Sequence, residues 1–174
     1  MGTRVQSKAY MITWYGPFHN TEEVEEWEYK QNINFNLYLL QGKRKYAKAY
    51  SYYCGQTKRS VSIRFKDKNH CICQIPNQLN IWVGTFDNHF KLEDINIAEN
   101  LLIYLLSSGI GDSQLLNERS LNFQSSNNVC LLNKWRNPNN YKQPENPIKA
   151  ALPEIAIYNA ENDVVKISKR LHYL

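Results

Sequence analysis

Two aromatic, apolar runs joined by a short basic stretch constrain the fold of this 174-residue chain most strongly. The first run is FNLYLLQ at residues 35–41, the second is AKAYSYYCG at residues 47–55, and the basic GKRK lies between them. Apolar and aromatic runs separated by a few polar residues are typical of a β-hairpin. We therefore expect two adjacent antiparallel strands connected by a positively charged loop.

The spacing of apolar residues changes from strand-like to helical directly after this hairpin. Ser60 is a typical N-cap residue, and Val61 and Phe65 follow it at helical spacing. Residues 79–86 predict a further strand, and the apolar stripe of residues 95–111 predicts a second helix. The order strand, strand, helix, strand, helix predicts an α/β (α+β) domain with a small central, mainly antiparallel sheet flanked by helices.

The sequence before this unit predicts an addition to it. Residues 8–14, KAYMITW, predict a strand. Asn20 and Glu23 have the spacing of a capping box, which predicts that a short helix begins at Thr21. We therefore expect an N-terminal elaboration over residues 1–34.

The sequence after the second helix predicts little regular structure until its end. Residues 112–135 predict a short helix followed by a polar loop, and the Pro- and Asn-rich residues 135–153 predict a long surface connection. Alternating apolar residues around NAEND, within residues 154–171, predict a C-terminal hairpin. We therefore expect a core over residues 35–133 and a C-terminal segment over residues 134–174.

Basic residues are concentrated in the middle of the chain. The formal net charge is +5, and Asp67 is the only acid among the many Lys and Arg side chains of residues 42–68. This concentration predicts a surface that binds a polyanion, and a solubilising face is the alternative. The basic residues that we expect to contact phosphates are Lys43, Arg44, Lys45, Lys58, Arg59 and Lys68.

Apolar runs and cysteines bear on the location of the protein. No apolar run approaches the ~20 residues of a membrane span, and the N-terminus lacks an apolar signal core, so we expect a cytoplasmic protein with no membrane contact. Four scattered cysteines fit reduced thiols. His70, Cys71 and Cys73 are conceivable zinc ligands, but structural zinc usually needs two ligand pairs, which favours a strand with buried thiols.

The hairpin and the helices after it resemble the GIY-YIG nuclease family. NLY at residues 36–38 stands at the GIY triplet and YCG at residues 53–55 stands at the YIG triplet, followed by QT as is common in that family. Arg64 stands where the family places its catalytic arginine, and Glu99 matches the metal-binding glutamate before an apolar Leu–Ile pair. The resemblance covers residues 35–122.

Three features depart from the family pattern. Asn36 replaces the glycine of the GIY triplet, and the spacing between Tyr38 and Tyr53 is longer than usual, which implies an enlarged hairpin loop. Lys68 stands one helical turn after the arginine, where many members carry His or Tyr. His70 is close enough in sequence to take that place. None of these departures removes the tyrosines, the arginine or the glutamate.

The resemblance implies hydrolysis of DNA phosphodiester bonds. This reaction needs a base that deprotonates water, a cationic group that stabilises the charge on the phosphoryl oxygens, and a Lewis acid for the leaving oxygen. Tyr38 or Tyr53 would assist deprotonation of water, although a phenol of pKa ~10 needs a nearby cation for this role. Arg64 would hold the scissile phosphate, and Mg²⁺ or Mn²⁺ bound by Glu99 would stabilise the leaving oxygen. Asn117 loosely matches a family asparagine, with a turn or cap residue as the alternative.

Three function classes follow from these patterns. The first is a divalent-metal DNA endonuclease of restriction or mobile-element type, and a homodimer that cuts both strands is compatible with the sequence. The second is a non-catalytic nucleic-acid-binding protein on the same fold, and the third is an α/β module that binds a small molecule or a protein. Both tyrosines, Arg64 and Glu99 favour the first class over the second, and the clustered bases disfavour the third.

Overall fold

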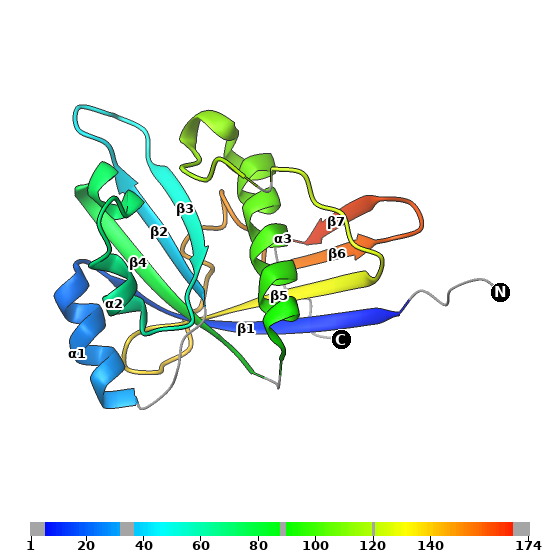
Figure 1. Cartoon of the computed structure of the whole chain (residues 1–174), viewed down its shortest axis with the longest axis horizontal. Helices are drawn as coiled ribbons and strands as arrows, with labels where there is room; N and C mark the ends of the chain where they lie inside the picture. Colours follow the sequence, from blue (N-terminus) through cyan, green and yellow to red (C-terminus); the bar gives the residue numbers. More distant parts are fainter. Residues whose placement is uncertain (1–5, 32–36, 88–89, 120, 169–174) are drawn as a thin grey trace.

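The computed structural model describes residues 6–31, 37–87, 90–119 and 121–168, which form one curled sheet with α-helices on both of its faces (Figure 1). None of the helices in these residues is long and apolar enough to cross a lipid bilayer.

The elements follow one another along the chain as strands that are interrupted by helices. The strands are β1 (Ser7–Phe18), β2 (Leu37–Lys43), β3 (Ser51–Gln56), β4 (Asn77–Phe86), β5 (Asn128–Arg136), β6 (Ile155–Asn159) and β7 (Val164–Ser168). The helices are α1 (Thr21–Gln31), α2 (Val61–Phe65) and α3 (Leu92–Ile110), with 3₁₀-helices η1 (Cys71–Gln74) and η2 (Asp112–Gln114).

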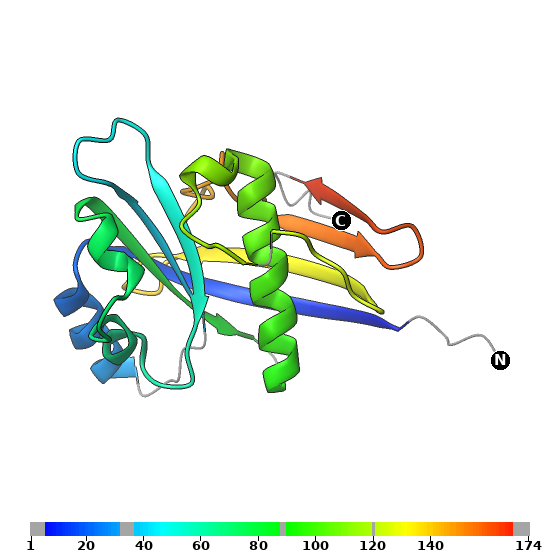
Figure 2. The same cartoon turned by 45° about the horizontal axis from the view of Figure 1, so that its top comes forward.

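The expected small central sheet flanked by helices is wrong, because the described strands form a seven-stranded mixed sheet in the order β3-β2-β4-β1-β5-β6-β7. The hairpin β2–β3 and the strand β4 pair antiparallel at one end of this sheet. β1 lies in the middle, where it pairs antiparallel with β4 and parallel with β5. The parallel pairing joins the C-terminal strands to the same sheet, which curls into a half-barrel (Figure 2).

The strand β5 replaces the polar loop that we expected over residues 112–135. Its residues alternate between buried and half-buried positions, as in a strand with one covered face. The polar Asn133 is 1% exposed on the covered face. Its side chain accepts a hydrogen bond from Trp14 Nε1 at 2.8 Å and donates one to the Pro153 carbonyl at 3.0 Å. The polar groups at this core position are therefore satisfied, although the residue type suggested a loop.

Each face of the sheet has its own core. The concave face packs against α3, whose apolar stripe includes the buried Leu101 and Leu102. The opposite face of β2, β4 and β1 packs against α1 and α2, through residues such as Trp27 and Phe65. Figure 1 shows α1 and α2 gathered at the β2–β4 end of the sheet, while α3 lies beside β3.

The buried carboxylate of Glu28 joins α1 to α2. Helix α2 has only five residues, too few for a helix that is stable alone. Glu28 is 9% exposed, and it accepts hydrogen bonds from the backbone N–H groups of Val61 at 2.7 Å and Ser62 at 2.9 Å. Ser60 is the N-cap, as expected, and accepts from Ile63 N. Glu28 thus fixes the start of a short helix on the body of the protein.

Replacing Glu28 with alanine should lower the free energy of unfolding by about 2–3 kcal/mol, because two buried backbone donors lose their acceptor. Urea unfolding followed by circular dichroism measures this change. The matched control is Glu26→Ala, which removes an exposed acid from the same helix and should leave the unfolding free energy nearly unchanged. Equal losses in the two variants would contradict the role of Glu28.

Candidate active site

Tyr38 and Tyr53 lie together because of the register of the β2–β3 hairpin. Tyr38 is opposite Gly55 and Leu40 is opposite Tyr53, so both phenol rings stand on the same face of the sheet. The rings stack with their centroids 5.9 Å apart. A Cβ atom at Gly55 would lie 2.5 Å from the Tyr38 hydroxyl, so only glycine leaves room for this ring.

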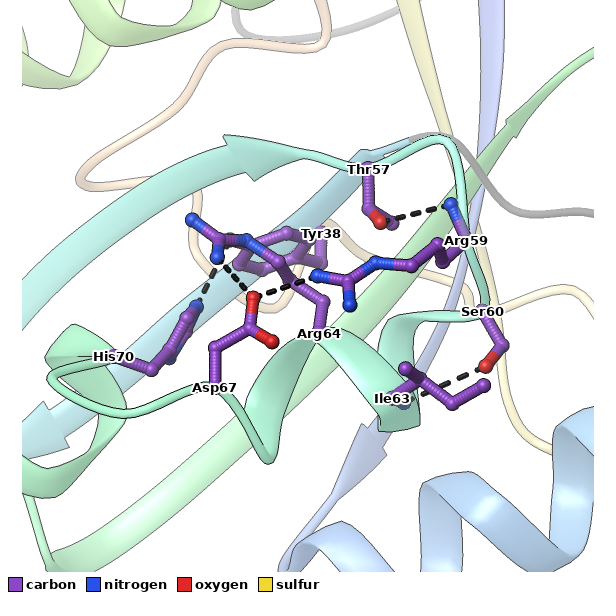
Figure 3. Close-up of polar contacts among 8 residues, drawn as sticks. All are labelled: Tyr38, Thr57, Arg59, Ser60, Ile63, Arg64, Asp67 and His70. Carbon is purple, nitrogen blue, oxygen red and sulfur yellow. Dashed lines mark hydrogen bonds and ion pairs between the residues drawn. The ribbon is translucent and has the colours of Figure 1, made fainter.

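The imidazole of His70 contacts the Tyr38 hydroxyl (Figure 3). His70 Nδ1 accepts a hydrogen bond from Ile72 N at 3.2 Å, so the ring proton lies on Nε2. Nε2 is 2.9 Å from the Tyr38 hydroxyl and therefore donates to its oxygen. Burial, helped by the Arg64 charge, lowers the pKa of His70 from 6.5 to about 4. The imidazole is consequently neutral at pH 7.

The two phenols differ in their access to solvent. Tyr38 is 1% exposed, whereas Tyr53 is only half-buried. Burial raises the pKa of both, and a hydrogen bond from the Tyr38 hydroxyl raises the pKa of Tyr38 while lowering that of Tyr53. Hydrogen bonds therefore run from His70 through Tyr38 to Tyr53. Tyr53 is the end of this chain and the phenol that a water molecule can reach.

The guanidinium of Arg64 adjoins the Tyr38 hydroxyl, but it is held by Asp67, an acid that sequence analysis did not identify as part of the site. Asp67 forms ion pairs with Arg64 and, at 2.7 Å, with Arg59 (Figure 3). Hydrogen bonds from Arg59 and Arg64 lower the pKa of Asp67. A carboxylate between two guanidiniums occupies the kind of position that a phosphate takes. The position of Asp67 as the only acid among the bases of residues 42–68 was the sequence feature that could have indicated this role.

Glu99 lies across the edge strand β3 from the phenols, because α3 packs on the concave face of the sheet. Its carboxylate accepts a hydrogen bond from Gln56 Nε2 at 2.8 Å. Burial raises the pKa of Glu99, and the Gln56 bonds oppose that shift. The charge of Glu99 contributes to the raised pKa of Tyr53, after burial and other effects. Glu99 is thus electrostatically coupled to Tyr53 from the other side of the strand.

The surroundings of Glu99 fit a hard cation that uses few protein ligands. Gln56 Nε2 also donates to Asn96 Oδ1 at 2.6 Å, so this amide nitrogen bridges the carboxylate and the Asn96 oxygen. Within the described ranges, no three His, Cys, Asp or Glu side chains form a group that could hold a metal. Mg²⁺ is commonly held by one or two carboxylates, water and substrate phosphates, so a single carboxylate is compatible with it.

The residues that sequence analysis considered as zinc ligands, His70, Cys71 and Cys73, are not gathered into a metal site among the described residues. The Nδ1 and Nε2 atoms of His70 are engaged by Ile72 and Tyr38. Cys71 and Cys73 lie in the 3₁₀-helix η1 rather than in the expected strand, and Cys73 is exposed.

Asn117 pairs with the outer edge of β3. Its side chain accepts a hydrogen bond from Cys54 N at 3.0 Å and donates one to the Cys54 carbonyl at 2.8 Å. Leu116 N donates to the Tyr52 carbonyl at 2.8 Å. Asn117 therefore imitates the backbone of a neighbouring strand and positions β3, which carries Tyr53.

The expected phosphate-binding residues lie in two places. Lys43, Arg44 and Lys45 belong to the end of β2 and the β2–β3 loop, and Lys58, Arg59 and Lys68 surround α2. Lys58 and Lys68 are exposed, whereas Arg59 is paired with Asp67. Asn36, at the GIY triplet, lies outside the described residues.

Comparison with known proteins gives no relative for this chain. No family model, no curated protein and no solved structure matches it. The resemblance to GIY-YIG nucleases therefore stays a prediction from the motifs.

The neutral state of His70 should make stability depend on pH. The pKa of the His70 imidazole is near 6.5 in the unfolded chain and about 4 in the folded chain, so the unfolded chain binds this proton more readily. The free energy of unfolding should therefore fall as the pH drops from 6.5 to 4, by about 3 kcal/mol. Urea unfolding at pH 7 and pH 4.5 should show a smaller fall in His70→Gln. The exposed His19→Gln is the control and should retain the wild-type fall; identical pH dependence in all three proteins would contradict this assignment.

Removing the charge of Asp67 should strengthen anion binding. Asp67→Asn releases Arg59 and Arg64 for phosphate, so the affinity for labelled DNA, used as a phosphate-rich probe, should rise by roughly tenfold. The matched control is Asp87→Asn, which removes an acid that pairs with Lys134 at 2.5 Å. Fluorescence anisotropy with labelled DNA measures both affinities. A gain no larger than that of the control would show that Asp67 does not compete with phosphate.

Proposed function

We propose that the protein is a DNA endonuclease that hydrolyses phosphodiester bonds with the help of a divalent cation. The observation that carries this proposal is the contact of two stacked phenols, a neutral buried imidazole and an arginine at one place on the sheet. Such a set can accept a proton and hold a phosphate. The basic segment around it supports a nucleic acid as the substrate.

Tyr53 is the proposed general base. It is the more exposed phenol, and the hydrogen bonds from His70 through Tyr38 supply donors to its oxygen when it is ionised. The proton of the attacking water passes to the Tyr53 oxygen while the water oxygen bonds to phosphorus. Because burial raises the pKa of Tyr53, only a small fraction is ionised at pH 7 in the free protein. The cleavage rate should therefore rise with pH.

Arg64 is the proposed phosphate ligand. Its guanidinium adjoins the Tyr38 hydroxyl and leads out of α2 towards solvent, with a side chain that is 35% exposed. A phosphate that replaces Asp67 would meet both Arg64 and Arg59, whose fixed charges stabilise the negative charge of the transition state. Tyr38 and His70 are positioning residues in this scheme, because they act through Tyr53.

Glu99 is the proposed metal ligand, with Mg²⁺ or Mn²⁺ as the cofactor. Glu99 and the phenols lie on opposite faces of the edge strand β3, so the proposal requires the substrate phosphate to sit at the end of this strand, where the charge of Glu99 still acts on Tyr53. When bound, such a cation supplies a Lewis acid for the leaving 3′-oxygen. Glu99 would offer the carboxylate, and the amide oxygen of Asn96 is linked to it through Gln56 Nε2. Cleavage of the bond between phosphorus and the 3′-oxygen leaves a 5′-phosphate end.

A non-catalytic nucleic-acid-binding protein is the second candidate. The ion pair between Asp67 and Arg64 favours this candidate, because it occupies the guanidinium in the free protein. The deep burial of Tyr38 favours it as well. Incubation with supercoiled, linear and branched DNA, with Mg²⁺ or Mn²⁺ and with a chelator, separates the two candidates. Binding without cleavage would leave only the second, and cleavage that survives a chelator would overturn the metal dependence.

Variants of the phenols test the mechanism. Tyr53→Phe should lower single-turnover cleavage by at least ~10²-fold, because it removes the base, and should spare binding. Tyr38→Phe removes one donor to Tyr53 and should cost roughly tenfold. Arg64→Ala should weaken binding and cleavage together, since a guanidinium also contacts the ground-state phosphate. Glu99→Gln should lower cleavage at a fixed Mg²⁺ concentration.

The matched control is Tyr29→Phe, which removes an exposed phenol from α1 and should leave cleavage unchanged. The wild-type rate should increase from pH 6 to pH 9, and this increase should be lost in Tyr53→Phe. Full activity of both Tyr38→Phe and Tyr53→Phe, or a covalent tyrosine–DNA adduct, would overturn the mechanism.

A further inference from the structure

The β2–β3 loop, residues 44–50, carries a tyrosine at its tip that has no apolar surroundings. Tyr46 is 90% exposed, and its backbone has a φ of +68°, a region that a tyrosine adopts rarely. Figure 1 shows the loop projecting from the end of the sheet between β2 and β3. A bulky ring in this position gains nothing from burial in the folded chain.

The charges around Tyr46 are unbalanced. The bases of this region are Lys43, Arg44, Lys45 and Lys48, and residues 42–51 contain no acid. Within the described part of the chain, no carboxylate forms an ion pair with any of these four, whereas Lys8, Lys66, Lys134 and Lys149 all have carboxylate partners. The loop and the last residue of β2 therefore present four cations, without carboxylate partners in the described residues, to an external anion.

Two of these four cations lie over aromatic rings. Lys45 Nζ lies 5.1 Å from the centroid of the Tyr46 ring, and Lys43 Nζ lies 4.8 Å from that of Tyr50. Tyr50 is fixed at the base of the loop, where its hydroxyl donates to Gln78 Oε1 at 2.9 Å. Alternating cations and aromatic rings match a polyanion whose charged backbone alternates with flat, stackable groups. A nucleic acid strand with unstacked bases has this chemistry.

We propose that the β2–β3 loop binds the unpaired bases of a DNA strand, with Tyr46 stacking on one base and the loop cations holding the flanking phosphates. This inference rests on the proposed function for the identity of DNA as the partner, and adds the kind of DNA that is bound. A base inside an intact duplex offers no free face to Tyr46. The preferred substrate is therefore DNA with a single-stranded or branched segment.

The test compares two tyrosines with the same exposure in different surroundings. Tyr46 is 90% exposed in the basic loop, and Tyr29 is 91% exposed on α1, which carries Glu25 and Glu26. Binding is measured in a chelator, so that cleavage plays no part, by anisotropy with fluorescein-labelled DNA. The probes are a 20-nucleotide single strand, the matching duplex and a duplex with a three-nucleotide bulge.

Tyr46→Ala should weaken binding to the single strand and the bulged duplex by roughly tenfold, the size of one lost base–aromatic stack, and change duplex binding less than twofold. Tyr46→Phe should retain wild-type affinity, because it keeps the stacking ring. Tyr29→Ala should bind all three probes as the wild type does. A 2-aminopurine base in the bulge should show quenching by the wild type that is lost in Tyr46→Ala.

Three outcomes would overturn the inference. Tyr46→Ala could bind the single strand as tightly as the wild type does, or Tyr29→Ala could lose as much affinity as Tyr46→Ala. The third outcome is that Tyr46→Ala binds all three probes more weakly than the wild type, including the intact duplex. A protein that binds single strands through Tyr46 but cuts no DNA would support the inference and contradict the endonuclease proposal. If the wild type cuts DNA and Tyr46→Ala binds the single strand as tightly as the wild type, the endonuclease proposal is supported and the inference about Tyr46 is contradicted. A wild-type protein that binds no DNA would overturn both proposals.

Discussion

Backbone pairing of β1 in the middle of the sheet is the interaction on which the rest of the structure depends. One edge of this 12-residue strand pairs antiparallel with β4, and the other edge pairs parallel with β5. β1 thereby connects the half of the sheet that carries the phenols with the half that the C-terminal strands form. The indole of Trp14 adds a side-chain connection, because its N–H donates to the buried Asn133 of β5. Both hydrophobic cores include residues of β1, so this strand contributes to the packing on each face of the sheet.

The candidate site is assembled from short elements that are held by their neighbours. β3 has six residues, and its register with β2 places Gly55 opposite Tyr38, where the phenol fills the space of a missing Cβ. α2 is held by Glu28, which keeps Arg64 close to the same phenol. The polar groups of the site thus owe their positions to backbone register and to one buried carboxylate, rather than to long helices or strands.

Local signals predicted most of the elements, though not β5, and non-local pairing decided the fold. The capping box at Asn20, the Ser60 N-cap and the alternation of the hairpins are properties of adjacent residues, and the structure has helices and strands at these places. The wrong fold class comes from the parallel pairing of β1 with β5, which joins residues more than a hundred positions apart and leaves no pattern in either segment. In the same way, the resemblance to GIY-YIG nucleases associated Arg64 with the phenols, but it could not show that Asp67 holds this arginine or that α3 carries Glu99 on the other face.

The amide of Asn117 has a consequence for the behaviour of the protein in concentrated solution. β3 is the last strand at its end of the sheet, and an unpaired strand edge is a template for strands of other molecules. Asn117 and Leu116 occupy the outward-facing backbone groups of Cys54 and Tyr52. The contacts that hold Tyr53 in place therefore also protect this edge against intermolecular β-sheet growth. As a result, β3 does not become the starting point of an aggregate.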